Sequence, residues 1–153
     1  MRGFLVLLLV ASTLALGARF APEGGLAFSR GIATVTTGER QLVLQVERAR
    51  TAEQRAQGLM GRRSLGPRAG MVFEYASATD GAFWMKNTLI PLDIAFYDGR
   101  GRILRTFTMT PCRTDDCPLY DPGVAFRGAL EVNAGSFRRW GVKRGDRIVV
   151  RAR

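Results

Sequence analysis

Short segments of alternating polar and apolar residues, separated by turn signals about every ten residues, constrain the fold of this chain most strongly. In residues 41–47, for example, Leu42, Leu44 and Val46 alternate with polar side chains, which is the pattern of a half-buried strand. Between two later segments of this kind, Asp98-Gly-Arg-Gly101 is a strong hairpin signal. The pattern predicts a mainly β fold at the margin of α+β, as a compact antiparallel barrel-like or sandwich domain.

About eight short strands and one or two short helices are expected. The predicted strands cover residues 32–36, 41–47, 71–75, 82–87, 92–97, 103–109, 128–132 and 147–151. Thr51 and Gln54 form a capping box at the start of a helix that is predicted to end at Gly61. One face of this helix would carry the apolar residues Ala52, Ala56, Leu59 and Met60. A further helical turn is expected at residues 136–140.

The length of 153 residues suits one domain with a modest core, and residues 31–153 are expected to form it. Residues 18–30, which are rich in Gly, Ala and Pro, are predicted to be a flexible leader. Before them, Arg2 and an uncharged apolar run precede small residues at Ala15 and Gly17, so residues 1–17 are predicted to be a signal peptide. The protein is therefore expected to be exported to the periplasm or the extracellular space. An uncleaved membrane anchor at residues 4–16 is the alternative, although this run is shorter than the ~20 residues of a spanning helix.

Two cysteines, Cys112 and Cys117, lie in one short loop and would be joined in an oxidising compartment. A structural disulfide is the prediction, with a redox-active pair as the alternative. Two thiols without any histidine leave a zinc site half empty, so neither a metal nor another cofactor is expected. The absence of histidine also excludes the common serine and cysteine triads.

The formal net charge of +10 would suit a nucleic-acid partner. The arginines, however, are scattered along the sequence and form no single block. For an exported protein, an envelope polysaccharide or a small anionic ligand is the more natural partner, so no nucleic-acid partner is predicted.

The run from Phe83 to Ile94 places an indole, an ammonium, an amide and a carboxylate among apolar residues. Each of these polar groups needs a partner if it is buried, so the run is either a satisfied structural network or a binding site. The candidate ligand-binding residues are Trp84, Lys86, Asn87, Asp93, Tyr120 and Glu131.

Strand alternation suggests how these residues are arranged. Trp84 and Lys86 would share one face of their segment, while Asp93 and Glu131 each point away from apolar neighbours. If the segments lie together, Lys86 is expected between the two carboxylates, as a charge-assisted cluster. Alternatively, Asp93 pairs with Lys86 or caps the turn before it, Glu131 pairs with a buried arginine, and Trp84 belongs to the core.

Several motifs occur in a fixed order along the chain. They are Arg55-Ala-Gln-Gly-Leu-Met-Gly-Arg62, Gly70-Met-Val-Phe73, Phe83-Trp-Met-Lys-Asn-Thr88, Ile90-Pro-Leu-Asp-Ile94, the loop with Pro111, Cys112, Cys117 and Tyr120, Leu130-Glu131 with Gly135, and Gly141-Val-Lys-Arg-Gly-Asp146. Together they resemble the family named Domain of Unknown Function 192 over residues 42–150. The resemblance implies a compact, mostly antiparallel β fold with a few short helices, and export signals in many members. It implies no activity, because none is established for the family.

Three functions remain open from the sequence. The first is an exported, envelope-associated binding module for a small anionic or carbohydrate-like ligand, held near Trp84 and Lys86. The second is a carboxylate-dependent hydrolase that uses Asp93 and Glu131 as acid and base. The third is a structural or stress-protective envelope protein without a ligand, whose charged cluster only stabilises the fold.

Overall fold

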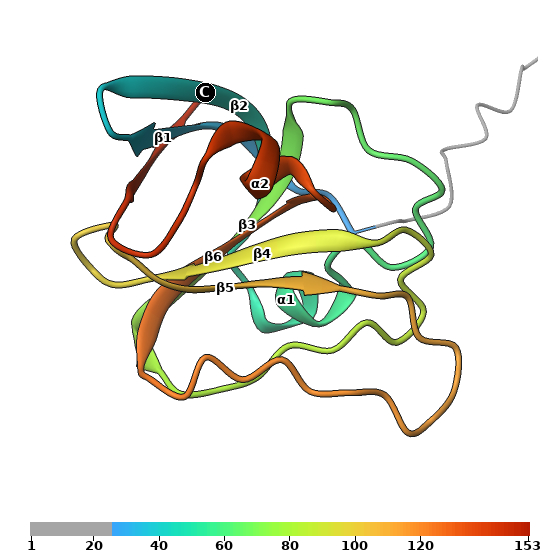
Figure 1. Ribbon diagram of the computed structural model, residues 1–153. Coiled ribbons are helices and arrows are strands. Elements are labelled where there is room, and N and C mark those ends of the chain that lie inside the picture. The colour runs from blue at the N-terminus through green and yellow to red at the C-terminus, as the bar shows by residue number, and fades with distance from the viewer. Residues whose placement is uncertain (1–25) are drawn as a thin grey trace, which may run out of the picture.

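The computed structural model describes residues 26–153 (Figure 1). The predicted signal peptide and most of the predicted leader lie outside the described residues. Within residues 26–153 the chain is mainly β, as the sequence predicts, but it forms seven strands instead of eight. The first strand already begins at Ser29, ahead of the boundary expected at residue 31.

All seven strands belong to one sheet with the order β5-β4-β6-β3-β2-β1-β7. The strands are β1 (Ser29–Thr37), β2 (Arg40–Ala49), β3 (Ala69–Thr79), β4 (Leu92–Tyr97), β5 (Ile103–Met109), β6 (Phe126–Asn133) and β7 (Arg147–Ala152), and the helices are α1 (Ala52–Gln57) and α2 (Ser136–Trp140). Neighbouring strands are antiparallel except β2 and β3, which are parallel and joined by the crossover that contains α1.

The sheet curls without closing into a continuous barrel, which makes the fold sandwich-like. Its edge strands β5 and β7 meet only near one corner. There the Ile103 N–H donates to the Asp146 carbonyl at 2.8 Å, and the Ile148 N–H donates to the Gly101 carbonyl at 2.7 Å. These bonds satisfy some of the backbone N–H and C=O groups that each edge strand would otherwise leave unpaired.

Each face of the sheet carries its own apolar cluster, because side chains alternate along every strand. One cluster is covered by α2 and includes Val35, Leu44, Val72, Leu130, Val132, Phe137 and Ile148. The other is covered by the α1 region and by two long loops, residues 80–91 and 110–125. It includes Leu59, Met71, Phe73, Met85, Ile94, Phe96 and Phe126. In Figure 1, α2 lies above β4, whereas α1 and the loops lie below it. Every residue of β4 is buried, so this strand has no solvent face.

The segment 82–87, predicted as a strand, is a loop. It makes only two isolated bridges, from Phe83 to Tyr120 and from Lys86 to Cys112. Asn87 adopts a left-handed backbone with φ of 57°, which ends any extended conformation. The loop therefore lies against the cysteine loop and does not join the sheet.

Helix α1 is also shorter than predicted. The capping box of Thr51 and Gln54 is present, as the sequence indicates. The helix ends at Gln57, since Gly58 leaves the helical region with φ of 47°. Leu59 and Met60 therefore follow the helix, and α1 itself buries no residue. The predicted apolar helical face is wrong for this reason.

The close approach of β5 and β7 at this corner can be tested by substitution. A Cβ at Gly101 would overlap the backbone carbonyl of Ile148, whereas a Cβ at Gly38 would meet nothing within 4 Å. Both glycines have positive φ, so Ala costs backbone strain at either position. Gly101→Ala should lower the free energy of unfolding by about 1–3 kcal/mol more than Gly38→Ala, measured by urea denaturation. Equal losses would show that the two edges do not approach this closely.

Candidate functional site

The cysteine loop is closed by a disulfide between Cys112 and Cys117, with Cα atoms 5.8 Å apart. The predicted pairing is therefore confirmed. This loop is bound to the central run by the backbone, since the Asn87 N–H donates to the Cys112 carbonyl and the Cys112 N–H donates to that of Met85. The disulfide thus braces the segment that carries Trp84 and Lys86.

Lys86 and Trp84 lie on the same side of their segment, as predicted. The Lys86 ammonium is 5.8 Å from the centroid of the Trp84 ring. Its ion-pair partner is Asp115 in the cysteine loop, at 2.6 Å. Asp93 and Glu131 do not pair with Lys86, so the predicted three-residue cluster does not form.

Asp93 and Glu131 lie on opposite faces of the sheet. Glu131 is directly opposite Ile94 in the pairing of β4 with β6, whereas Asp93 is opposite Val132. Directly paired residues point to the same face of the sheet, so Glu131 shares the face of Ile94. Asp93 is the neighbour of Ile94 on β4 and therefore points to the other face. The two carboxyl groups therefore cannot flank one bond, as the predicted hydrolase requires.

Asp93 is a satisfied structural carboxylate. It is 2% exposed and accepts hydrogen bonds from the Thr108 hydroxyl at 2.7 Å and from the Phe137 N–H at 2.9 Å. The second bond satisfies a free N–H in the first turn of α2. Asp93 thereby fixes α2 to the sheet.

Tyr120 and Asn87 connect loops. The Tyr120 hydroxyl accepts from the Thr110 N–H at 3.2 Å, and its ring lies 6.0 Å from that of Phe107. The Asn87 carbonyl accepts from the Gly61 N–H at 2.9 Å, which joins the central run to the segment after α1. Neither residue lines the cavity that contains Trp84 and Glu131.

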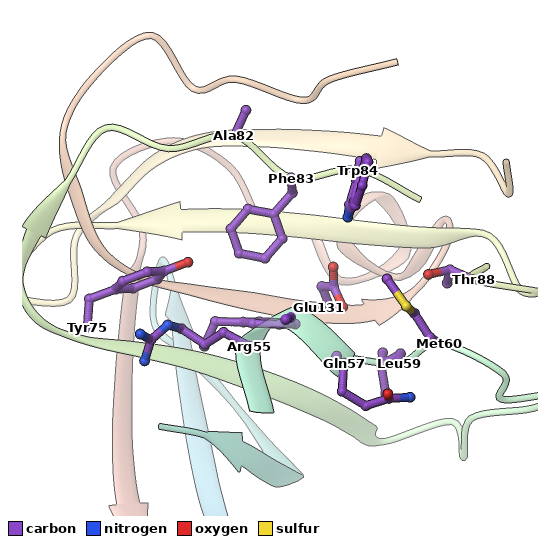
Figure 2. A pocket seen from close by; sticks show the side chains of 13 residues that line it. Arg55, Gln57, Leu59, Met60, Tyr75, Ala82, Phe83, Trp84, Thr88 and Glu131 are labelled. Carbon is purple, nitrogen blue, oxygen red and sulfur yellow. The ribbon is translucent and has the colours of Figure 1, made fainter. Parts of the chain in front are cut away.

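This cavity has a volume of about 260 Å³ and lies between α1, β3, β6 and the loop that follows β3 (Figure 2). Phe83 forms part of its wall and packs edge-to-face on Phe73 and Phe96. Trp84 stands at the rim and is 47% exposed. The cavity thus has packed aromatic rings in its wall and one accessible indole at its rim.

Glu131 provides the carboxyl group of this cavity. The residue is 4% exposed, and its carboxyl makes no hydrogen bond or ion pair within residues 26–153. Figure 2 shows it pointing into the cavity on the side of Trp84. Burial raises the pKa of this carboxyl from 4.5 to about 8. In the empty cavity it is therefore mostly protonated at neutral pH, able both to donate and to accept.

Arg55 and Tyr75 form the far end of the cavity. The guanidinium of Arg55 lies 4.7 Å above the Tyr75 ring and donates to the backbone carbonyls of Arg50 and Glu74. Burial raises the pKa of the Tyr75 hydroxyl, and the positive charge of Arg55 offsets part of this rise. Arg55 is thereby fixed beside Tyr75 and does not pair with Glu131 (Figure 2).

Sequence reasoning identified Trp84 and Glu131 but missed Arg55, Tyr75 and Thr88 as lining residues. The alternation of Met71, Phe73 and Tyr75 was the available signal, since Met71 pairs with Glu131 and these side chains share its face. Thr88 is buried behind the turn at Asn87 and could not be placed from local pattern.

Among residues 26–153, no group of three or more Cys, Asp or Glu side chains is arranged to hold a metal ion. In the same part of the chain, neither helix has the length and apolar character needed to cross a membrane.

Comparison with known proteins agrees with the fold. The model of the family DUF192, described as "Uncharacterized ACR", matches residues 33–150. A candidate transcription regulator from Sinorhizobium meliloti 1021 is 33% identical with a TM-score of 0.78, and the match covers 83% of this chain and 98% of that chain. A protein of unknown function from Novosphingobium aromaticivorans DSM 12444 is 34% identical with a TM-score of 0.72, covering 77% and 83%. No curated protein matches this chain.

The structural role of Asp93 can be tested by substitution. Asp93→Ala leaves the Phe137 N–H and the Thr108 hydroxyl without their acceptor, so it should lower the free energy of unfolding by about 2–4 kcal/mol. Urea denaturation measures the loss. Asp115→Ala is the control, because it removes only an exposed partner of Lys86 and should leave stability unchanged. An Asp93 variant as stable as the control would contradict this role.

The raised pKa of Glu131 predicts how stability depends on pH. The unfolded chain ionises this carboxyl near pH 4.5, whereas the folded protein keeps the proton until about pH 8. Between these values the folded state binds more protons, so the free energy of unfolding falls as pH rises, by at most about 1.4 kcal/mol per pH unit. Below pH 4.5 both states are protonated and the penalty vanishes.

Glu131→Gln should remove this fall. Urea denaturation at about pH 5 and about pH 8 compares the two proteins, and the absence of histidine keeps this interval free of imidazole titration. The parent should lose stability over the interval, while the variant should not. Parallel slopes would mean that Glu131 is solvated in the folded protein.

Proposed function

The chain belongs to the uncharacterised family DUF192, and we propose that it is an exported, envelope-associated binding module that holds a small carbohydrate-like ligand. The observation that carries the proposal is the buried Glu131 carboxyl, which opens into the cavity without a protein partner. Within residues 26–153 no fully buried side-chain oxygen or nitrogen lacks a hydrogen-bond partner, so the unbonded oxygens of Glu131 face the open space of the cavity. A partner that enters the cavity can satisfy them there. A ligand hydroxyl group supplies that partner.

The other polar groups of the cavity suit the same kind of ligand. Figure 2 shows the Thr88 hydroxyl and the indole nitrogen of Trp84 directed toward the space that Glu131 faces. Together with the Glu131 carboxyl, they offer donors and acceptors to a compact hydroxylated molecule. The Trp84 ring adds an apolar surface on which the C–H face of a sugar can pack. A cavity of about 260 Å³ suits a ligand of roughly monosaccharide size.

An anionic ligand fits this cavity less well than a neutral one. The group buried deepest is Glu131, which repels a second carboxylate whenever it is ionised. The positive charge of Arg55 lies over Tyr75 at the far end of the cavity, away from the space that Glu131 and Trp84 face. Lys86 is paired with Asp115. The proposal therefore retains the carbohydrate-like ligand and drops the anionic one.

The proposal places function in the cavity and not on nucleic acid. The candidate regulator from Sinorhizobium meliloti raises the question of DNA binding. Within residues 26–153, however, α1 has six residues and α2 has five, too short to act as a recognition helix in the major groove. The disulfide supports an oxidising environment for the proposed module.

Trp84→Ala should weaken saccharide binding by at least about tenfold, because a rim aromatic contributes much of the contact with a small ligand. Isothermal titration with glucose, N-acetylglucosamine and glucuronate measures the affinities. Leu119→Ala is the matched control, since Leu119 is 69% exposed and lies outside the cavity. Both variants should melt near the parent temperature.

Two results would contradict the proposal. The first is a parent protein that binds none of these saccharides. The second is a Trp84→Ala protein that binds them as tightly as the Leu119→Ala control. Tighter binding of glucuronate than of glucose would instead show that the ligand is anionic.

A further inference from the structure

Among the residues that line the cavity, Glu131 is the only acidic one. Building on the proposed function, we propose that the natural ligand is a carbohydrate-like molecule with a primary amine, and that Glu131 binds its ammonium group. A neutral sugar satisfies the hydrogen bonds of the carboxyl, but only an ammonium group also compensates the charge that the carboxyl acquires when it ionises.

The aromatic walls support the same ligand. Trp84 and Phe83 line the part of the cavity that the Glu131 carboxyl faces, whereas Tyr75 lies at the far end under the Arg55 guanidinium (Figure 2). Aromatic faces attract cations, and this attraction grows when water is excluded. An indole and a phenyl ring beside one carboxylate therefore favour an ammonium group over an uncharged substituent.

None of the neighbouring charged groups within residues 26–153 pairs with Glu131, so its carboxyl can bind the ammonium group of a ligand. On α1, Arg55 keeps its positive charge, but its bonds to two backbone carbonyls hold it over Tyr75 at the far end of the cavity. Burial alone raises the pKa of Glu131. On β3, the facing titratable group is the Tyr75 hydroxyl, which is neutral in this range. On β4, the directly opposite residue is the apolar Ile94. Beside Trp84, the Lys86 ammonium is offset by Asp115.

Binding should therefore release a proton. In the empty cavity at about pH 6, Glu131 is protonated, because burial holds its pKa at about 8. An ammonium ligand binds the ionised carboxylate, so the carboxylic acid proton leaves for the buffer as the ion pair forms. The reaction is Glu–COOH plus R–NH₃⁺ giving the Glu–COO⁻ and R–NH₃⁺ pair plus H⁺. A neutral sugar releases no proton.

The test compares glucosamine with glucose and N-acetylglucosamine, which lack the charged amine. Isothermal titration at about pH 6, in two buffers of different ionisation enthalpy, measures affinity and proton release together. The parent should bind glucosamine at least about tenfold more tightly than either neutral sugar and release close to one proton. Glu131→Gln, which keeps the shape of the side chain, should lose both the preference and the proton release. Leu119→Ala, which lies outside the cavity, should keep both.

The outcomes separate this inference from the proposed function. Equal affinity for all three sugars, with no proton release, would overturn the amine and leave the carbohydrate-binding module intact. Binding to none of the three would overturn both. An amine preference that persists in Glu131→Gln would place the ammonium elsewhere and overturn the role of Glu131. If the variant does not fold, the proton count and the affinity ratio in the parent still decide the question.

Discussion

The burial of one carboxyl group, that of Glu131, connects the fold to the proposed function. Its position on β6 places it on an apolar face beside Met71 and Ile94, where ionisation is costly. No side chain within residues 26–153 offsets this cost, so the carboxyl remains available to whatever enters the cavity. A fold that needed only stability would replace this group with an apolar residue.

The arrangement of the sheet explains why this carboxyl differs from its neighbour on β4. Both β4 and β6 are covered on two faces, one by α2 and the other by the α1 region and the long loops. Asp93 faces α2 and receives two hydrogen bonds. Glu131 faces the opposite side, where the chain leaves a cavity. Two acidic residues with similar sequence surroundings thus differ in their environment, since one is bonded to α2 and β5 and the other faces the cavity.

The same contrast shows how far local pattern predicts this structure. Alternation, the hairpin at Asp98 and the capping box at Thr51 depend on neighbours in sequence, and they predict most strands and the start of α1. Whether Asp93 and Glu131 share a face depends on strand register, and a shift of one residue reverses it. The segment around Lys86 also alternates like a strand, but its hydrogen bonds go to the cysteine loop. Register and loop partners are long-range properties that one sequence does not reveal.

The most direct test of this account is the titration of Glu131 itself. Carbon-13 NMR can follow the carboxyl resonance, and comparison with Glu131→Gln assigns it. In the ligand-free protein the account predicts a midpoint of about 8, set by burial without a partner. A midpoint near the ordinary value of 4.5 would show that the carboxyl is solvated or already paired, and the cavity would lose the feature on which its proposed function depends.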